Sequence, residues 1–407
     1  MRGLVRLLAA LALATPALAA PQRPNIVLIV ADDFGRECLG AYGGTSYDTP
    51  NLDRLARSGA RFTEVFSTPR CSPSRVTLLT GRYTFRSTNE WGHLPPEEIT
   101  FGQLLRDAGY ATALAGKWQL GRHRDDPQLV NRFGFERYCC WGWEEGPRYW
   151  RPLIWQDGEI RGDVQDRYGP DVHGEYLIDF IGRQRDRPFL AYYAMTLTHL
   201  PGKDEPPGPR GRRETFAEMV ANMDSGVGQL IEALDRLGLR ETTLVLFTSD
   251  NGSPAGVISQ LVDGTVRGGK DLLTDAGTRV PLIASWPGVI APGAVHDDLI
   301  DLSDFLPTLA ELAGAEPPRD RIVDGRSFAP LLVGGPTLPR EWAYTLWRGR
   351  SWVRDREWKL YGDGKLFDMR LDAREKRPVL AARDSPRSAA VRRRLEGAFA
   401  QLGPGSR

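Results

Sequence analysis

A continuous apolar run near the beginning of the sequence constrains the fold more than any other feature. Residues 25–31 read Asn-Ile-Val-Leu-Ile-Val-Ala, and two aspartates follow directly. An uninterrupted apolar run of this length predicts a strand that is buried on both faces. Similar runs occur at residues 110–115, 188–197 and 243–248. A sheet built from such strands needs a layer of helices on each of its faces.

Segments with helical periodicity alternate with these strands. We expect helices at residues 100–108, 176–183, 214–237 and 303–313. Strands that alternate with helices predict an α/β fold, in which helices sandwich a mainly parallel central sheet.

The end of the sequence follows a different pattern. Pro-rich joins at residues 316–318 and 334–339 precede four short strand-like pieces between residues 341 and 368. This spacing predicts a small antiparallel sheet. The expected organisation is therefore a large domain at residues 21–335 and a small C-terminal α+β subdomain at residues 336–407.

Polar side chains follow the predicted strands at the points where these strands end. They are Asp32 and Asp33, Lys117, His199, and Asp250 with Asn251. In parallel α/β sheets, ligands bind beyond the carboxyl ends of the strands. The sequence therefore predicts one shared site at this edge of the sheet.

A short segment around Cys71 carries a second local signal. Ser72 suits the N-cap position and the proline after it suits the first turn, so a helix is expected at residues 73–80, ended by Gly81. The thiol of Cys71 would then lie at the positive end of a helix dipole, beside Arg75. Such an environment lowers the pKa of a thiol and attracts anions. The alternative is a surface helix that follows a buried structural cysteine.

The segment from Cys71 to Arg82 reads Cys-Ser-Pro-Ser-Arg-Val-Thr-Leu-Leu-Thr-Gly-Arg. It resembles the signature C-x-P-S-R-x-x-x-x-T-G-R of the type I, formylglycine-dependent sulfatases of the alkaline-phosphatase-like superfamily. The resemblance runs from about residue 23 to 372. It implies a sulfuric ester hydrolase in which a maturation enzyme oxidises Cys71 to formylglycine. In that family the hydrated aldehyde attacks the sulfate ester, and the sulfated hemiacetal then expels sulfate when its second hydroxyl loses a proton.

Four oxygen-donor residues close two of the buried strands: Asp32, Asp33, Asp250 and Asn251. A donor set made only of oxygen suits a hard cation such as Ca²⁺ or Mg²⁺ rather than Zn²⁺. One such pair alone is more often a capped turn, so the prediction depends on the two pairs together. The resemblance implies Ca²⁺, with Mg²⁺ as the alternative, and adds modified Cys71 as a ligand.

Lys117 and Lys270 are two of only six lysines among 53 basic residues, and each follows a glycine. A single loop lysine is usually solvated, but the positions of these two relative to the other motifs favour a function. The resemblance implies that both bind sulfate oxygens, with Lys270 near the leaving oxygen. It also implies that His199 binds sulfate or protonates the departing alcohol.

The sequence departs from the sulfatase pattern at one position. The family usually reads G-K-W-H-L-G, and Gln119 stands where the histidine belongs. That histidine is thought to accept the proton when sulfate is expelled, and a glutamine cannot accept a proton at neutral pH. Either His123 takes this role, or another base does, or turnover is slow.

Residues 133–160 contain a dense set of Trp and Tyr side chains, with Arg148 and Arg151 among them. Packing of a long loop explains such a stretch, and a platform for a sugar ring is the functional alternative. We expect a sulfated small molecule or glycan as substrate, and favour a carbohydrate. The alternative functions are a phosphonate or phosphate ester hydrolase of the same superfamily and a catalytically silent sulfoglycan-binding homologue.

Residues 1–20 have the features of a secretory signal peptide, with two arginines, an apolar run and Ala-Leu-Ala near the end. They predict a secreted or periplasmic protein. No later apolar run reaches the ~18 residues of a spanning helix, so no membrane span is expected. The net charge of +1 gives no reason to expect a nucleic-acid partner. Four cysteines are too few for a disulfide scaffold, although a bond among Cys38, Cys139 and Cys140 stays open.

Overall fold

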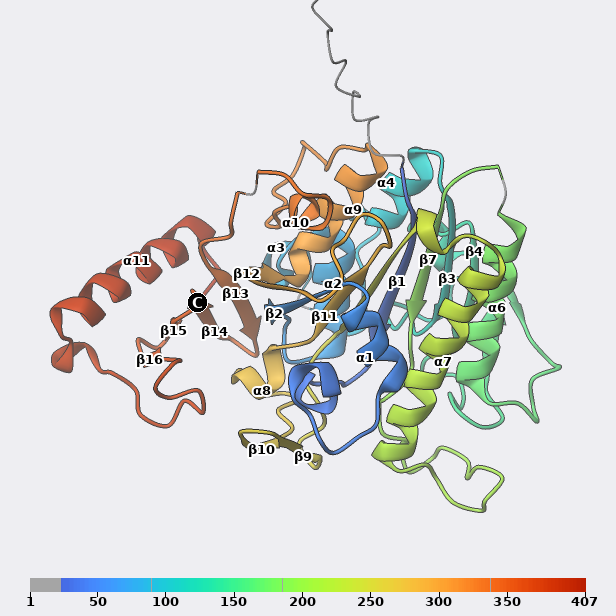
Figure 1. Ribbon diagram of the computed structural model, residues 1–407, viewed down its shortest axis with the longest axis horizontal. Coiled ribbons are helices and arrows are strands. Elements are labelled where there is room, and N and C mark those ends of the chain that lie inside the picture. Colours follow the sequence, from blue (N-terminus) through green and yellow to red (C-terminus); the bar gives the residue numbers. More distant parts are fainter. Residues whose placement is uncertain (1–22, 89, 185, 337) are drawn as a thin grey trace, which may run out of the picture.

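The computed structural model describes residues 23–407 apart from residues 89, 185 and 337, so the predicted signal peptide lies outside the described residues. A ten-stranded sheet forms the centre of the molecule (Figure 1). Its strands are β1 Asn25–Ala31, β2 Ala60–Phe66, β3 Ala111–Gly116, β4 Arg137–Trp141, β5 Ile154–Gln156, β6 Glu159–Ile160, β7 Phe189–Ala194, β8 Thr243–Ser249, β11 Leu282–Ser285 and β12 Ala294–Asp301. They lie in the order β12-β2-β11-β8-β1-β7-β3-β4-β5-β6.

Most strands of this sheet run in one direction. The five neighbours β8-β1-β7-β3-β4 are parallel throughout. Strands β11 and β5 run against the others, because β11 pairs antiparallel with β8 and β2, and β5 with β4 and β6. The predicted mainly parallel sheet is confirmed, and the sheet as a whole is mixed. Only residues 157 and 158 separate β5 from β6, which is too short for a crossover, so these two strands form an antiparallel hairpin.

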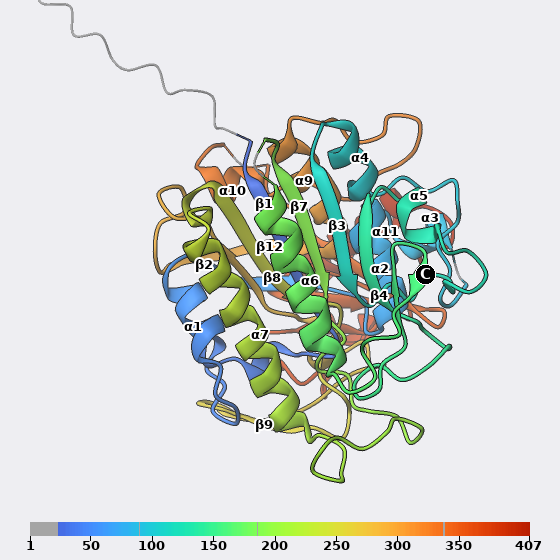
Figure 2. The same cartoon turned by 90° about the vertical axis from the view of Figure 1, so that its right-hand side faces the viewer.

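Helices cover both faces of the sheet, as the buried strands predicted. The longer ones are α1 Pro50–Arg57, α2 Cys71–Thr80, α4 Phe101–Asp107, α6 Gly169–Arg183, α7 Phe216–Arg236 and α9 Phe305–Ala313. The shorter ones are α3 Thr84–Ser87, α5 Leu129–Arg132, α8 Asp275–Thr278 and α10 Ala329–Val333. Apolar residues of α2, α4 and α9 share a core with Ile26, Leu28 and Val30 of β1. Those of α1, α6 and α7 pack with the alternate residues of β1 on the other face, where Figure 2 shows α6 and α7 in front of the strands.

One helix is longer than its periodicity suggested. Helix α6 begins at Gly169 rather than near residue 176. Pro170 suits the first turn of a helix, and Val172 continues the buried face toward the N-terminus.

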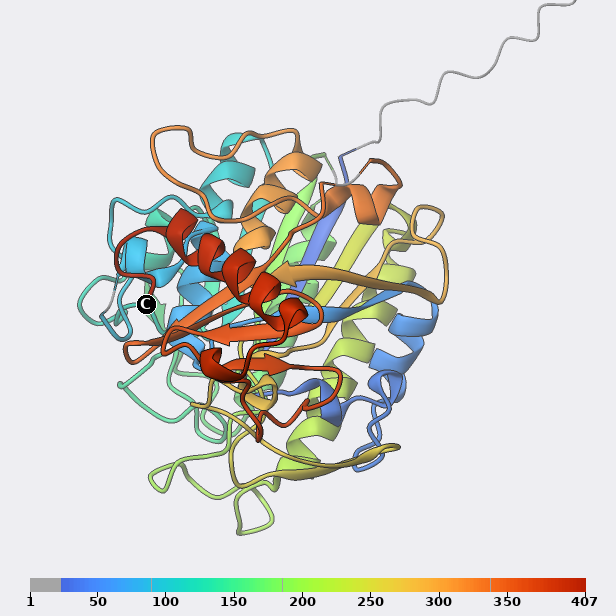
Figure 3. The ribbon, with the colours of Figure 1, turned by 90° about the vertical axis from the view of Figure 1, so that its left-hand side faces the viewer.

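A small antiparallel sheet follows the central one in sequence and packs beside it (Figure 3). Its strands, in order, are β13 Ala343–Trp347, β14 Arg350–Arg354, β15 Trp358–Tyr361 and β16 Leu366–Asp368, and helix α11 (Pro386–Leu402) packs against it. Buried Arg354 joins this sheet to the larger part of the molecule through an ion pair with Asp275 at 2.8 Å. The predicted antiparallel sheet is confirmed, and the domain boundary at residue 335 stays a prediction.

Two further features complete the fold. Strands β9 (Ile258–Leu261) and β10 (Gly264–Arg267) form a separate hairpin. Within the described part of the chain, no helix is both long enough and apolar enough to cross a membrane.

Candidate active site and metal centre

Helix α2 starts at Cys71 itself, so the predicted start at residue 73 was wrong. Ser72 does not cap the helix, because its Oγ accepts a hydrogen bond from the backbone N–H of Gly92 at 2.9 Å. Arg70 takes the N-cap position with an extended backbone and no side-chain cap. Gly81 ends the helix with a φ of 68°, as predicted. Residue 71 therefore lies in the first turn, where backbone N–H groups have no partner within the helix.

The Cys71 thiol does not have the lowered pKa that its place at a helix start suggested. The side chain is 2% exposed. Burial, together with the carboxylates of Asp32 and Asp250, raises the pKa of Cys71 despite the nearby ammonium of Lys117. A thiol of raised pKa is a poor nucleophile at neutral pH. The unmodified cysteine is therefore unsuited to attack an ester.

Three ion pairs surround residue 71, two of them fully buried and the third partly buried at Lys270. The pairs are Lys117 with Asp32 (Nζ to Oδ2, 2.6 Å), Lys270 with Asp33 (Nζ to Oδ2, 2.5 Å) and Arg75 with Asp250 (Nη2 to Oδ2, 2.8 Å). The Arg75 guanidinium also donates from Nη1 to the carbonyl of Lys117 at 3.2 Å. Each carboxylate thus faces one cationic side chain, and the formal charge of the cluster is zero.

Some oxygens of this cluster have no partner among the described residues. They are Asp32 Oδ1 and Asn251 Oδ1, and both are buried. Ligand atoms of Asp32, Cys71 and Asp250 lie within 4.8 Å of one another. A buried polar atom without a partner costs free energy unless a ligand fills its coordination. Converging carboxylate and amide oxygens fit a hard divalent cation.

The two carboxylates that converge on residue 71 differ in pKa. Burial alone would raise the pKa of Asp32, but Lys117 and other nearby cations lower it well below its usual range. Burial and the neighbouring Asp32 charge raise the pKa of Asp250 to about 6, against the effect of Arg75. At neutral pH both groups are carboxylates and can bind a cation.

Two site residues have a left-handed backbone, which is uncommon for residues other than glycine. Asp33 has a φ of 64° and Gln119 a φ of 55°. The Asp33 backbone N–H donates to Asp250 Oδ1 at 3.1 Å, and its side chain accepts from Asn251 Nδ2 at 2.8 Å. Strained backbone held by such contacts is characteristic of functional sites.

His199 lies at the edge of the ion-pair cluster. Its Nε2 is 3.8 Å from Asp33 Oδ2, and its Nδ1 is 2.9 Å from the carbonyl of Leu200. Burial lowers the pKa of His199 to about 4, although the carboxylates of Asp33 and Asp32 oppose this effect. The ring is neutral at neutral pH, so it accepts a proton more readily than it donates one until an anion approaches.

Gln119 and His123 have different surroundings. Gln119 is buried, and its Oε1 has no partner among the described residues. The His123 ring instead stacks on Tyr138 and Trp155, with centroid distances of 5.3 Å and 6.1 Å. Burial lowers the pKa of His123 to about 4, and the charges that act on it belong to Glu145 and Asp126 rather than to the cluster. The role of His123 as the base therefore stays a prediction, with no contact to the cluster in its support.

The loop that carries Lys270 is joined to the segment before Cys71, a contact that the sequence did not suggest. The backbone N–H of Asp271 donates to the carbonyl of Pro69 at 2.9 Å, and the Asp271 carboxylate forms an ion pair with Arg70. The only signal in the sequence was position, since Arg70 directly precedes Cys71 and Asp271 directly follows Lys270.

Part of the aromatic stretch is buried, and no cysteine forms a disulfide among the described residues. Trp141, Tyr149 and Trp155 are buried, which favours packing over a platform for sugar. Tyr149 donates to the carbonyl of Thr196 at 2.8 Å and to that of His199, and so holds the His199 loop. All four cysteines are free.

Comparisons with known proteins identify the family of this chain. A family model described as Sulfatase matches residues 24–315. Human arylsulfatase A is 37% identical over 359 residues, covering 80% of this chain and 70% of that protein. N-acetylgalactosamine-6-sulfatase of Canis lupus familiaris is 36% identical over 366 residues, covering 80% of this chain and 69% of that protein.

Among solved structures, the crystal structure of Ps i-CgsB has a TM-score of 0.80 at 27% identity, covering 95% of this chain and 94% of that chain. A second structure of Ps i-CgsB is a complex with k-i-k-neocarrahexaose. The chain therefore belongs to the sulfatase family, the sulfuric ester hydrolases of the alkaline-phosphatase-like superfamily.

Proposed function

We propose that this protein hydrolyses a sulfate ester of a carbohydrate by S–O cleavage, with formylglycine made from Cys71 and a bound Ca²⁺, for which Mg²⁺ is the alternative. The observation that carries the proposal is the buried cluster around residue 71. Its three ion pairs, and the oxygens that have no partner among the described residues, lie around residue 71, where the sequence Cys-Ser-Pro-Ser-Arg begins. The raised pKa of the Cys71 thiol supports an oxygen rather than a sulfur nucleophile.

The cation would be held by the oxygens of Asp32, Asp33, Asp250 and Asn251, with residue 71 as a further ligand. When bound, the ion would polarise the sulfuryl group and offset its negative charge. The formal charge of the cluster supports a coupling between ion and substrate. The three ion pairs sum to zero, so a divalent ion gives the site the positive charge that an anionic ester needs.

The basic side chains have distinct proposed roles. Lys117 and Lys270 bind sulfate oxygens once the cation shares the carboxylates that they now neutralise, with Lys270 on the side of the leaving oxygen. Arg75 orients Asp250 and the Lys117 backbone, because it bonds to both.

His199 is the histidine that contacts the cluster, which supports its role in proton transfer to the departing alcohol. An approaching anionic ester raises the pKa of this ring, so the ring can hold a proton. It then donates that proton to the oxygen of the departing alcohol. Gln119 can orient a hydroxyl with its buried amide but cannot accept a proton. The base that the family places at position 119 is therefore replaced by His123 or by another group.

Two further proposals concern the maturation of the protein. Cys71 is 2% exposed in the fold, which supports its oxidation by a maturation enzyme before the chain folds. Residues 1–20 support export to the periplasm or beyond the cell.

Residues 21–335 would form the catalytic domain and residues 336–407 the smaller subdomain.

The names of the relatives support a carbohydrate substrate. One relative is named as a sulfatase of N-acetylgalactosamine-6-sulfate, and Ps i-CgsB was solved with an oligosaccharide. A panel of sulfated mono- and oligosaccharides, an aryl sulfate and an aryl phosphate tests the proposal on protein co-produced with a maturation enzyme. We expect turnover of sulfate esters well above that of the phosphate, abolished by Cys71→Ala. Chelation should remove activity, and Ca²⁺ or Mg²⁺ should restore it better than Zn²⁺.

Preferential turnover of the phosphate would favour the phosphoester-hydrolase alternative. Tight binding of sulfated sugars without turnover of any ester would favour the silent binding homologue.

A further inference from the structure

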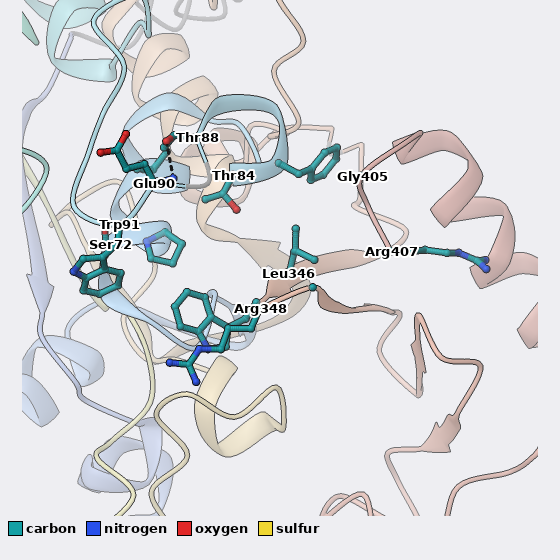
Figure 4. A pocket seen from close by; sticks show the side chains of 14 residues that line it. Ser72, Thr84, Thr88, Glu90, Trp91, Leu346, Arg348, Gly405 and Arg407 are labelled. Carbon is teal, nitrogen blue, oxygen red and sulfur yellow. Dashed lines mark hydrogen bonds between the residues drawn. The ribbon is translucent and has the colours of Figure 1, made fainter.

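A cavity of about 540 Å³ lies beside helix α2, on the side that faces the small antiparallel sheet. Its lining begins with Ser72 and Pro73, directly after residue 71, and includes Trp91 and the turn between β13 and β14. Figure 4 shows these side chains around a common space. The volume falls within the range of about 300–1,000 Å³ that is typical of small-molecule sites. Nothing in the proposed sulfate chemistry uses this cavity.

Two tryptophans give the cavity an aromatic wall. The rings of Trp91 and Trp347 have a centroid distance of 6.5 Å and an interplanar angle of 59°. Trp91 is 40% exposed, which is unusual for so large an apolar side chain. The Nε1 of Trp347 is buried, and no described residue accepts its hydrogen bond. A sugar ring would cover exposed apolar surface on Trp91.

Two arginines lie over the aromatic wall, and only Arg348 of the two lines the cavity itself. Arg348 stacks over the Trp347 ring at 5.3 Å and forms no ion pair with a described residue. Arg70 stacks over Trp91 at 5.0 Å. Its ion-pair partner is Asp271, the residue directly after Lys270. Arg407 stacks instead on Phe399, and in Figure 4 its side chain points away toward α11.

The acidic side chain in the lining, Glu90, forms no ion pair with Arg348. In Figure 4, Glu90 lies beside Thr88, at the opposite end of the labelled group from the Arg348 guanidinium. An exposed arginine without a partner, held on an aromatic ring, can form a charge-assisted hydrogen bond with an incoming anionic group.

We propose that this cavity binds the sugar unit next to the one that carries the scissile sulfate, and that Arg348 pairs with an anionic group on that neighbouring unit. The proposal rests on the proposed sulfatase function and names its substrate class as an oligosaccharide with more than one anionic group. That second group is a sulfate or a carboxylate, which share the charge and the oxygen acceptors that a guanidinium recognises. The sugar ring stacks on the tryptophan wall, and the Arg348 guanidinium pairs with the anionic group.

The test compares substrates that share one scissile sulfate. The first is an aryl sulfate, the second a monosulfated neutral disaccharide, and the third and fourth are the same disaccharide with a second sulfate or a uronic carboxylate on the adjacent unit. The variant is Arg348→Asn, because position 348 has a φ of 50° and asparagine tolerates this left-handed conformation. The control is Arg350→Asn, an exposed arginine on the same hairpin that does not line the cavity.

We expect Arg348→Asn to raise KM for both dianionic disaccharides by roughly five- to twentyfold, as loss of a charge-assisted hydrogen bond predicts. Its kcat/KM for the aryl sulfate and for the neutral disaccharide should stay unchanged, and Arg350→Asn should behave as wild type. An effect confined to one of the dianionic substrates would identify which anion the cavity selects. Equal effects of the Arg348 and Arg350 variants, or no effect on either dianionic substrate, would overturn the proposal.

A binding measurement separates failure of this proposal from failure of the proposed function. Calorimetry with the full-length Cys71→Ala protein reports affinity for the same disaccharides without turnover. Trp91→Ala in that background should weaken both the neutral and the charged disaccharide, because each stacks its ring. Sulfatase activity that is insensitive to the cavity variants would refute the subsite alone. Binding that depends on the cavity without any ester turnover would refute the proposed function alone.

Discussion

Replacing Lys117 by methionine separates a structural ion pair from a metal site, because Lys117 and a bound cation would share one carboxylate. Lys117 Nζ lies 2.6 Å from Asp32 Oδ2, and both side chains are at most 1% exposed. Loss of one partner from a buried pair costs about 3–5 kcal/mol, since the remaining charge has no counter-charge. We expect Lys117→Met to lower the free energy of unfolding by this amount in a buffer that contains a chelator.

A divalent cation should reduce that loss. In the variant, Asp32 no longer divides its charge between an ammonium and the ion, so the variant should bind Ca²⁺ at least about tenfold more tightly than wild type. At an ion concentration of about 100 times its Kd, binding stabilises wild type by about 2.7 kcal/mol. A tenfold lower Kd adds about 1.4 kcal/mol at the same concentration. The destabilisation by Lys117→Met should therefore shrink by about 1.4 kcal/mol or more when Ca²⁺ is added.

Lys359 provides a matched control. It is also fully buried, and its Nζ lies 2.9 Å from Glu375 Oε1 and 3.3 Å from Asp275 Oδ1, in the contact with the small sheet. Lys359→Met should cost a similar free energy that Ca²⁺ does not change. Urea unfolding followed by tryptophan fluorescence, with chelator and with saturating Ca²⁺, gives all of these differences. An equal response of the two variants to Ca²⁺ would refute a cation site at Asp32.

Two histidines give further predictions. Phenylalanine at position 123 keeps the stack on Tyr138 and Trp155 but removes both ring nitrogens. With His123 as the base, His123→Phe should lower kcat by ~10²–10⁴, whereas an unchanged kcat would assign the base to another group. Burial lowers the pKa of His173 to about 3 in the folded state, whereas the usual pKa of a histidine is about 6.5. As the pH falls below about 6.5, the unfolded state therefore binds a proton that the folded state does not, and the free energy of unfolding decreases. The free energy of unfolding of His173→Leu relative to wild type should therefore rise by about 2 kcal/mol between about pH 7.5 and about pH 5, and equal differences at both pH values would contradict this assignment.

Much of the architecture follows from local patterns in the sequence. The apolar runs that end in Asp32 and Asp250 predicted buried parallel strands, and the carboxyl ends of β1 and β8 do lie side by side. The reversed strands β11 and β5 were not predictable from these runs, because an apolar run does not encode the direction of its neighbours. The start of α2 was misplaced because Ser72 bonds to Gly92, a partner that its local sequence does not reveal.

The site was predictable as a set of residues but not as a set of contacts. Position at strand ends and the resemblance to sulfatases together selected Asp32, Lys117 and Asp250. Which lysine faces which aspartate depends on loops that meet only in the fold. The sign of the pKa shift at Cys71 was also wrong, because the residue is buried and lies beside two carboxylates, which the local sequence does not reveal. The cavity beside α2 joins Trp91 to a hairpin distant in sequence, so no local pattern indicates it.

The proposed chemistry depends on conversion of Cys71, and one experiment measures that conversion and the activity together. The protein is produced with graded amounts of a maturation enzyme. Peptide mass analysis then gives the fraction of the protein in which the thiol of residue 71 has been replaced by an aldehyde. Turnover of an aryl sulfate is measured on the same samples. We predict that kcat rises in proportion to that fraction and that Cys71→Ala shows no turnover while its free energy of unfolding stays close to that of wild type. Turnover by unconverted protein at the rate of the converted form would contradict the account.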